Sequence, residues 1–206
     1  DFDRGGRSVL GIRPLLWKNG WPVAGEVFKE GTYEIESERR GYALELAVDF
    51  VRIEYTRHRF WEKDDTPVVP LKSQTLEDVI ETWPQGKINV RIGDYMFRPH
   101  QKWTITAVPD GGGYLGGPYY KIVIEGTNRA LAATADAEVV TVPEFTGAPE
   151  QLWRIDQLTD GTYRIMPKEV PGTDKELVLV SVGDSTPSLG EFNMNSDNSK
   201  WNFRDH

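Results

Sequence analysis

The stretch EQLWRIDQLTDGTYRI, residues 150–165, contains two short patterns that recur along the chain. The first is a glutamine two positions before a tryptophan, and the second is Gly-Thr-Tyr-x-Ile. Three tryptophans are followed by a polar and then an apolar residue: Trp103, Trp153 and Trp201. They are spaced 50 and 48 residues apart. Gln101 and Gln151 precede the first two, and Ser199 precedes the third. This spacing predicts three copies of one structural unit.

The second pattern has the same period. GTYEI at 31–35 and GTYRI at 161–165 share four of five residues, and YYKIVI at 119–124 lies in the corresponding place between them. Apolar residues alternate with polar ones within each copy, and turns rich in Gly, Pro, Asp and Asn separate the runs, so short antiparallel strands are expected. Three such units, each of about four strands, bury a core only when they pack around a pseudo-threefold axis. The sequence therefore predicts an all-β protein, a β-trefoil of three repeats.

The predicted repeats are unequal. They span about 27–105, 106–155 and 156–206, behind a short N-terminal extension, 1–26. The first repeat carries an insertion of roughly 25 to 30 residues. Within it, SQTLEDVIETW at 73–83 predicts a helix, with Thr75 as a cap and Pro84 as its stop. One helical face would be apolar: Leu76, Val79, Ile80 and Trp83.

The composition limits the classes of function. The net charge is -8, and the basic residues are scattered among carboxylates, so no nucleic-acid surface is expected. The absence of cysteine excludes disulfides, thiol catalysis and thiolate metal sites. No apolar run is long enough to span a membrane. The three histidines have no metal-ligand spacing, and DGGGYLGG at 110–117 lacks the Gly-Lys-Ser/Thr ending of a phosphate loop, so neither a metal nor a cofactor is expected.

The repeated motifs resemble a known family. Gln-x-Trp at the end of a repeat, with Gly-x-Tyr-x-Ile at its start, resembles the ricin-type β-trefoil lectin domains over residues 27–206. The preceding GRSVLGIRPLLWKNGWPVAGE, residues 6–26, is similar to the end of arabinanase-like enzymes of glycoside hydrolase family 43, where it follows a five-bladed catalytic propeller. The chain opens on Asp1, and we expect it to be a fragment or a processed product of something longer.

The resemblance implies a function. Residues 27–206 would be the non-catalytic, carbohydrate-binding accessory module of a secreted bacterial enzyme, extracellular or periplasmic, acting on plant polysaccharide such as arabinan or galactan. The catalytic carboxylates of that family lie in the propeller, so the chain alone is expected to be no enzyme. The partners would be the polysaccharide and the catalytic domain of the parent enzyme.

The resemblance also implies site residues. Each sugar-binding repeat of this family needs an early acid, an aromatic platform and an amide beside Gln-x-Trp, which together grip hydroxyls and the apolar face of a sugar. In the first repeat Glu45 stands in the acid's place and His100 precedes Gln101, which makes an altered site. In the second repeat the three places hold Ala132, Val142 or Pro143, and Glu150, so no usual pocket is expected there.

The third repeat is intermediate. Val178 or Val180 replaces the acid, whereas amides remain at Asn193, Asn195 and Asn198. Tyr114 and Trp61 are candidate alternative platforms. One of Tyr119 and Tyr120 should pack inward, because neighbours alternate along a strand.

Two alternatives follow from these departures. The repeated Trp103, Gln151, Trp153 and Trp201 are expected to be structural, with indoles in the core and glutamines satisfying backbone groups of the turns. Since the acid is missing in two repeats, a purely structural domain that docks on the propeller without binding sugar is the competing hypothesis.

Overall fold

The computed structural model describes residues 15–18, 21–24, 28–38, 42–48, 76–96, 98–114, 117–182 and 186–205. Strands dominate this part of the chain, and its α-helix is the short α1 (Leu76–Glu81). Three single-turn 3-10 helices precede the repeated tryptophans: η2 (Pro99–Gln101), η3 (Pro149–Gln151) and η4 (Asp197–Ser199). The predicted all-β class is confirmed.

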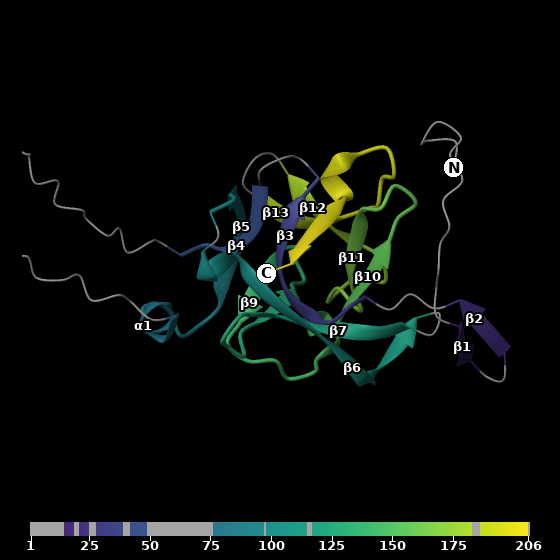
Figure 1. The fold of residues 1–206 in the computed structure, drawn as a ribbon, viewed down its shortest axis with the longest axis horizontal. Helices are drawn as coiled ribbons and strands as arrows, with labels where there is room; N and C mark the ends of the chain where they lie inside the picture. Colours follow the sequence, from purple (N-terminus) through teal and green to yellow (C-terminus); the bar gives the residue numbers. More distant parts are fainter. Residues whose placement is uncertain are drawn as a thin grey trace, which may run out of the picture.

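Six strands close into an antiparallel barrel (Figure 1). They are β3 (Gly31–Ser37), β6 (Lys102–Tyr114), β7 (Gly117–Ile124), β10 (Trp153–Gln157), β11 (Tyr163–Pro167) and β14 (Trp201–Asp205). Each pairs with the next along this order, and β14 pairs with β3. Closure leaves no free edge in the barrel.

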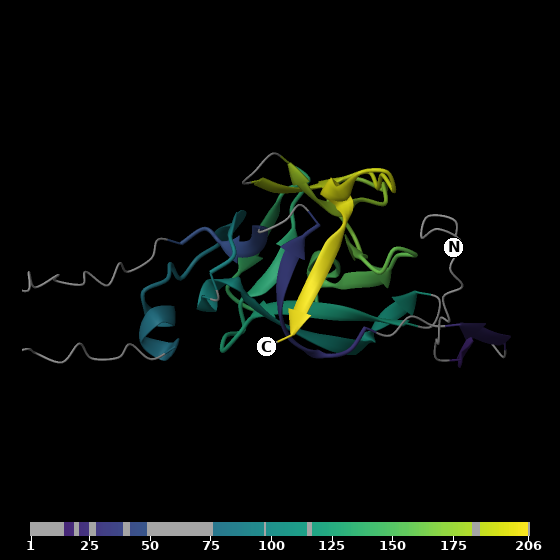
Figure 2. The same cartoon turned by 45° about the horizontal axis from the view of Figure 1, so that its top comes forward.

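Three hairpins pack together against the barrel (Figure 2). They are β4 (Tyr42–Leu46) with β5 (Ile88–Asp94), β8 (Ala130–Ala133) with β9 (Val139–Val142), and β12 (Val178–Val182) with β13 (Thr186–Gly190). Strand β5 pairs with β9, and Glu138 bridges to Ser188 of β13, so the hairpins also contact one another. Two barrel strands and one hairpin form each repeat, which confirms the predicted β-trefoil.

The repeated tryptophans join barrel to hairpins in the same way three times. Each indole is fully buried, with 0% exposure, and its Nε1–H donates to a leucine carbonyl of the adjacent hairpin. The pairs are Trp103 to Leu44 at 2.8 Å, Trp153 to Leu131 at 2.9 Å and Trp201 to Leu179 at 2.8 Å. Burying an indole requires a partner for its N–H, and the threefold arrangement supplies one in every repeat.

The glutamines before the tryptophans hold the preceding turns. Gln101 accepts from the Met96 N–H at 2.9 Å and donates to the Asp94 carbonyl at 2.7 Å. Gln151 accepts from the Thr146 N–H at 2.7 Å. In the third repeat the Ser199 hydroxyl donates to the Asn193 carbonyl at 2.9 Å. In each repeat the side chain two positions before the tryptophan thus satisfies turn backbone groups.

An aromatic cluster lies among the strand ends of the barrel around Phe28. Its ring is in contact with four others: Tyr33, Tyr120, Tyr163 and Phe203. The Phe28 N–H donates to the Tyr120 hydroxyl at 2.7 Å, and this hydroxyl donates to the Phe28 carbonyl at 3.1 Å. Tyr120 is therefore the buried member of the pair with Tyr119, which is only half-buried.

The end of the insertion is attached to the second repeat. Helix α1 ends at Glu81, two residues before the end of the predicted 73–83, and Trp83 is buried in the core. Arg129 donates to the carbonyls of Gly86 and Pro84, both at 2.7 Å. Leu76 and Ile80 of α1 face Gly126 in the β7–β8 turn, at a positive φ of 72°. The predicted cap, Thr75, lies outside the described residues.

Upstream, β1 (Leu15–Lys18) and β2 (Trp21–Ala24) form a two-stranded hairpin whose described strands pair with each other and with no strand of the trefoil.

Candidate functional site

The first repeat contains a buried carboxylate at the position predicted to grip sugar. Glu45 of β4 is 2% exposed. Its Oε1 accepts from Arg91 Nε at 2.6 Å, and its Oε2 accepts from Gln101 Nε2 at 2.7 Å. His100 Nε2 lies 3.1 Å from the same Oε2. The three residues predicted for this repeat thus meet around one carboxylate.

The local backbone allows this cluster to close. Gly93 on β5 faces the Glu45 side chain, and a Cβ there would lie 2.5 Å from the carboxyl carbon. Burial by itself raises the pKa of Glu45, but hydrogen bonds with His100, Arg91 and Gln101 outweigh it and hold the pKa below its usual value. The carboxylate is therefore charged at neutral pH.

Arg91 is the part of the cluster that faces solvent. Its side chain is 38% exposed, and it also donates to the Val48 carbonyl at 3.1 Å. The sequence reasoning missed this residue. The signal that could have found it is strand register, because Arg91 is the cross-strand partner of Glu45 in the β4–β5 pair.

The other repeats lack the acid. The tryptophan bonds make Leu44, Leu131 and Leu179 equivalent, so the residues after them are equivalent too: Glu45, Ala132 and Val180. Ala132 is buried in β8. Val180, rather than the core residue Val178, holds the third position.

The predicted amides of the third repeat lie on an exposed turn. Asn193, Asn195 and Asn198 are all exposed. Asn193 Oδ1 accepts from the Asn195 N–H at 3.0 Å, which is a local turn contact. Tyr114 ends β6, but its side chain and the whole of Trp61 lie outside the described residues.

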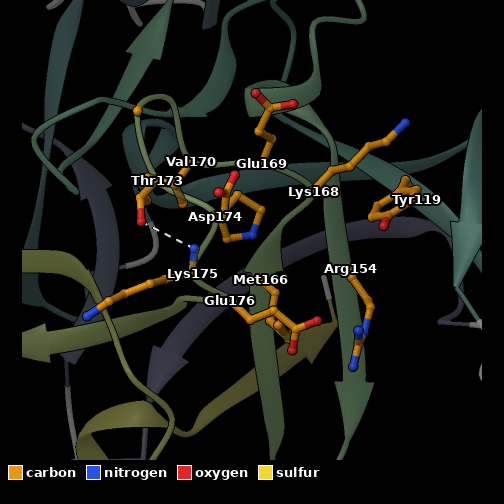
Figure 3. A pocket seen from close by; sticks show the side chains of 12 residues that line it. Tyr119, Arg154, Met166, Lys168, Glu169, Val170, Thr173, Asp174, Lys175 and Glu176 are labelled. Carbon is orange, nitrogen blue, oxygen red and sulfur yellow. Dashed lines mark hydrogen bonds between the residues drawn. The ribbon is translucent and has the colours of Figure 1, made fainter.

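A pocket of about 800 Å³ lies at a different place, between the second and third repeats (Figure 3). Its walls are Tyr119 of β7, Arg154 of β10, Met166 and Pro167 of β11, and the loop that follows β11. The loop contributes Lys168, Glu169, Val170 and residues 172–176. Apart from Tyr119, none of these residues stood out from the sequence as a candidate for a site.

Two cations of the pocket wall, Lys168 and Arg154, have protein partners. Lys168 Nζ donates to the Gly111 carbonyl at 2.6 Å and lies 5.2 Å from the centre of the Tyr119 ring. Arg154 pairs with the Asp156 carboxylate, to which its Nε donates at 2.7 Å. These protein contacts position the Lys168 and Arg154 side chains in the ligand-free structure.

Metal-ligand groups and membrane-spanning helices are both absent from the described part of the chain. It contains no group of three or more His, Asp or Glu side chains placed to hold a metal ion. Nor does any helix within it have the length and apolar character needed to cross a bilayer.

Known proteins resemble this chain in part of its sequence and in its fold. Residues 99–187 match the family model described as "Ricin-type beta-trefoil lectin domain-like". None of the curated proteins matches the chain in sequence.

Three solved structures share the fold. A designed threefold-symmetric protein has 20% identity and a TM-score of 0.54, over 85% of this chain and 99% of its own. A Polyporus squamosus lectin, solved with a human-type influenza-binding epitope, has 16% identity and a TM-score of 0.55, over 86% of this chain and 50% of its own. An exo-β-1,3-galactanase of Clostridium thermocellum has 15% identity and a TM-score of 0.52, over 89% of this chain and 32% of its own.

This chain spans only half or less of the length of these two natural proteins. Residues 99–187 are thus similar to a ricin-type β-trefoil lectin-like domain, and the chain shares the β-trefoil fold of these structures.

Proposed function

We propose that this chain is a non-catalytic, carbohydrate-binding accessory module of a secreted polysaccharide-degrading glycosidase, with arabinan- or galactan-type plant polysaccharide as its ligand. The observation that carries the proposal is the lectin-like trefoil, whose residues 99–187 match the lectin-like family. Two features favour the glycosidase context: the resemblance of residues 6–26 to the end of family 43 enzymes, and the fold shared with a galactanase. Binding would raise the local concentration of substrate.

The first-repeat cluster is the proposed site at the family's usual position. Its chemistry suits hydroxyl groups, because the Arg91 guanidinium donates and the Glu45 carboxylate accepts hydrogen bonds. A ligand would meet Arg91 first, with Glu45, His100 and Gln101 behind it. The exposed third-repeat amides offer a second, shallower set of donors and acceptors.

The alternative is a structural domain that docks on the catalytic propeller without binding sugar. Two observations favour it. Ala132 and Val180 stand where the acid is needed. Glu45, the acid that remains, is enclosed by protein partners on both of its oxygens.

Affinity gel electrophoresis tests the proposal directly. The chain is run through native gels containing arabinan, galactan or xylan, and through a gel without polymer. We expect retardation by arabinan or galactan. Migration unaffected by all three polymers would contradict carbohydrate binding and favour the docking domain. Release of reducing sugar by the chain alone would contradict the non-catalytic assignment.

A matched pair of variants tests the first-repeat site. Arg91→Ala removes the exposed donor of the cluster, and we expect it to reduce retardation. Lys29→Ala removes an exposed cation before β3 and serves as the control. Equal retardation of Arg91→Ala, Lys29→Ala and the parent chain would exclude the first-repeat cluster as the site.

A further inference from the structure

The loop between β11 and β12 differs from its counterparts in the other repeats. Residues 38–41 join β3 to β4, residues 125–129 join β7 to β8, and residues 168–177 join β11 to β12. The third connection is therefore about twice as long as either of the others. The corresponding turn of the second repeat is covered by Leu76 and Ile80 of α1, which belongs to the insertion in the first repeat.

The long loop has a defined shape. Val170 and Leu177 are buried and anchor its two ends to the core. Between them Val170 bridges to Thr173, and Gly172 adopts a positive φ of 83° that lets the chain turn back. The pocket wall is thus an ordered turn attached to the core at both ends.

The pocket combines an aromatic wall with oxygen acceptors. In Figure 3, Tyr119 stands on one side, and the carboxylate-bearing side chains Glu169, Asp174 and Glu176 come from the loop on the other. Met166 and Pro167 of β11 add apolar surface. All three acids are exposed, so they remain open to hydroxyl donors from solvent.

The charges of the lining select among ligand classes. The lining carries three carboxylates and three cations: Glu169, Asp174 and Glu176, with Arg154, Lys168 and Lys175. Of the cations, Arg154 is paired with Asp156, and Lys175 lies 3.5 Å from Glu191. The lining therefore favours neither sign of charge, and the net charge of -8 disfavours a polyanion. A neutral, hydroxyl-rich ligand instead donates hydrogen bonds, which the carboxylates accept. Its apolar ring face can also pack against the aromatic wall. The volume of about 800 Å³ lies within the range of small-ligand sites.

We propose that the pocket lined by Tyr119, Arg154 and the β11–β12 loop binds a short neutral oligosaccharide. This inference rests on the proposed carbohydrate-binding function and places a binding site away from the positions equivalent to Glu45, Ala132 and Val180. Binding in this pocket would not depend on the acid that the second and third repeats lack.

Chemical-shift mapping locates the site without altering the chain. The backbone amides of the ¹⁵N-labelled protein are followed by NMR during titration with arabinotriose and, separately, galactotriose. We expect the largest shifts at Tyr119, Arg154 and residues 168–176. Shifts confined to residues 91–101 or 193–199 would overturn the inference and leave the proposed function intact. If neither sugar shifts any amide, both fail together.

Two variants and a matched control measure the contribution of the pocket. Tyr119→Ala removes the aromatic wall, and Glu176→Gln keeps the shape of the side chain but removes its charge. Each should weaken binding about tenfold, since a hydrogen bond to a charged group or an aromatic platform is lost. Glu81→Gln makes the same charge change on exposed α1 and should bind as the parent chain does. Retained dispersion of the amide signals would show that each variant is folded. Affinities within twofold of the parent for both pocket variants would refute the site.

Discussion

Replacing Trp153 by Phe perturbs the contact that recurs in every repeat. The indole is fully buried, and its N–H donates to the Leu131 carbonyl at 2.9 Å. Phe keeps a ring but removes the donor and leaves a cavity. Leaving a buried carbonyl without its donor costs about 1–3 kcal/mol, and the lost atoms and residual cavity add about 1–2 kcal/mol. We expect the free energy of unfolding to fall by about 2–5 kcal/mol.

The same change at Trp103 or Trp201 should cost a similar amount, because both indoles are equally buried and donate at 2.8 Å. Urea unfolding followed by circular dichroism measures the loss, and thermal unfolding should show a Tm lower by about 2–4 °C per kcal/mol for a chain of this size. A loss below about 1 kcal/mol at any of the three positions would refute the reasoning. It would mean that the indole N–H is not a shared support of the three repeats.

Three further changes test separate parts of the domain. Asp160→Asn removes a carboxylate whose pKa burial alone would raise, but which hydrogen bonds from Thr162 and Lys200 lower to about 2. The carboxylate stabilises the fold above its ordinary value of 3.8, and this stabilisation is lost as the pH falls towards 2. With the side chain 36% exposed, the loss at pH 7 should be only about 1 kcal/mol, and urea unfolding of the two proteins should converge near pH 2. Gly93→Ala places a Cβ 2.5 Å from the Glu45 carboxyl group and should cost about 1–3 kcal/mol in the same assay, whereas Gly86→Ala, with open space around it, should be nearly neutral. Phe28→Ala empties the centre of the aromatic cluster and should cost about 2–4 kcal/mol; a Tm equal to that of the parent chain would exclude a stabilising role.

The fold could be predicted because its key residues repeat in register. One Gln-x-Trp is weak evidence, but Trp103, Trp153 and Trp201 at nearly equal spacing require three equivalent places for a buried indole. The helix near Leu76 was also predictable, since the helical period of apolar residues is a local property. Its C-terminal end differs by two residues because helix termini depend on packing and capping.

The site was only partly predictable. Glu45, His100 and Gln101 could be placed together because a family pattern links their positions. Arg91 was missed because the strand register that sets it opposite Glu45 spans an insertion, which hides the pairing in the sequence. The pocket was missed for the same reason, as Tyr119, Arg154 and the β11–β12 loop meet only when the barrel closes.

The position of Phe28 has a mechanical consequence. Its ring lies among four barrel aromatics, and its backbone is bonded on both sides to the hydroxyl of Tyr120. Tension applied at Phe28 would therefore be transmitted to the barrel through this ring and its two hydrogen bonds. A polypeptide attached there would be anchored through the trefoil core itself.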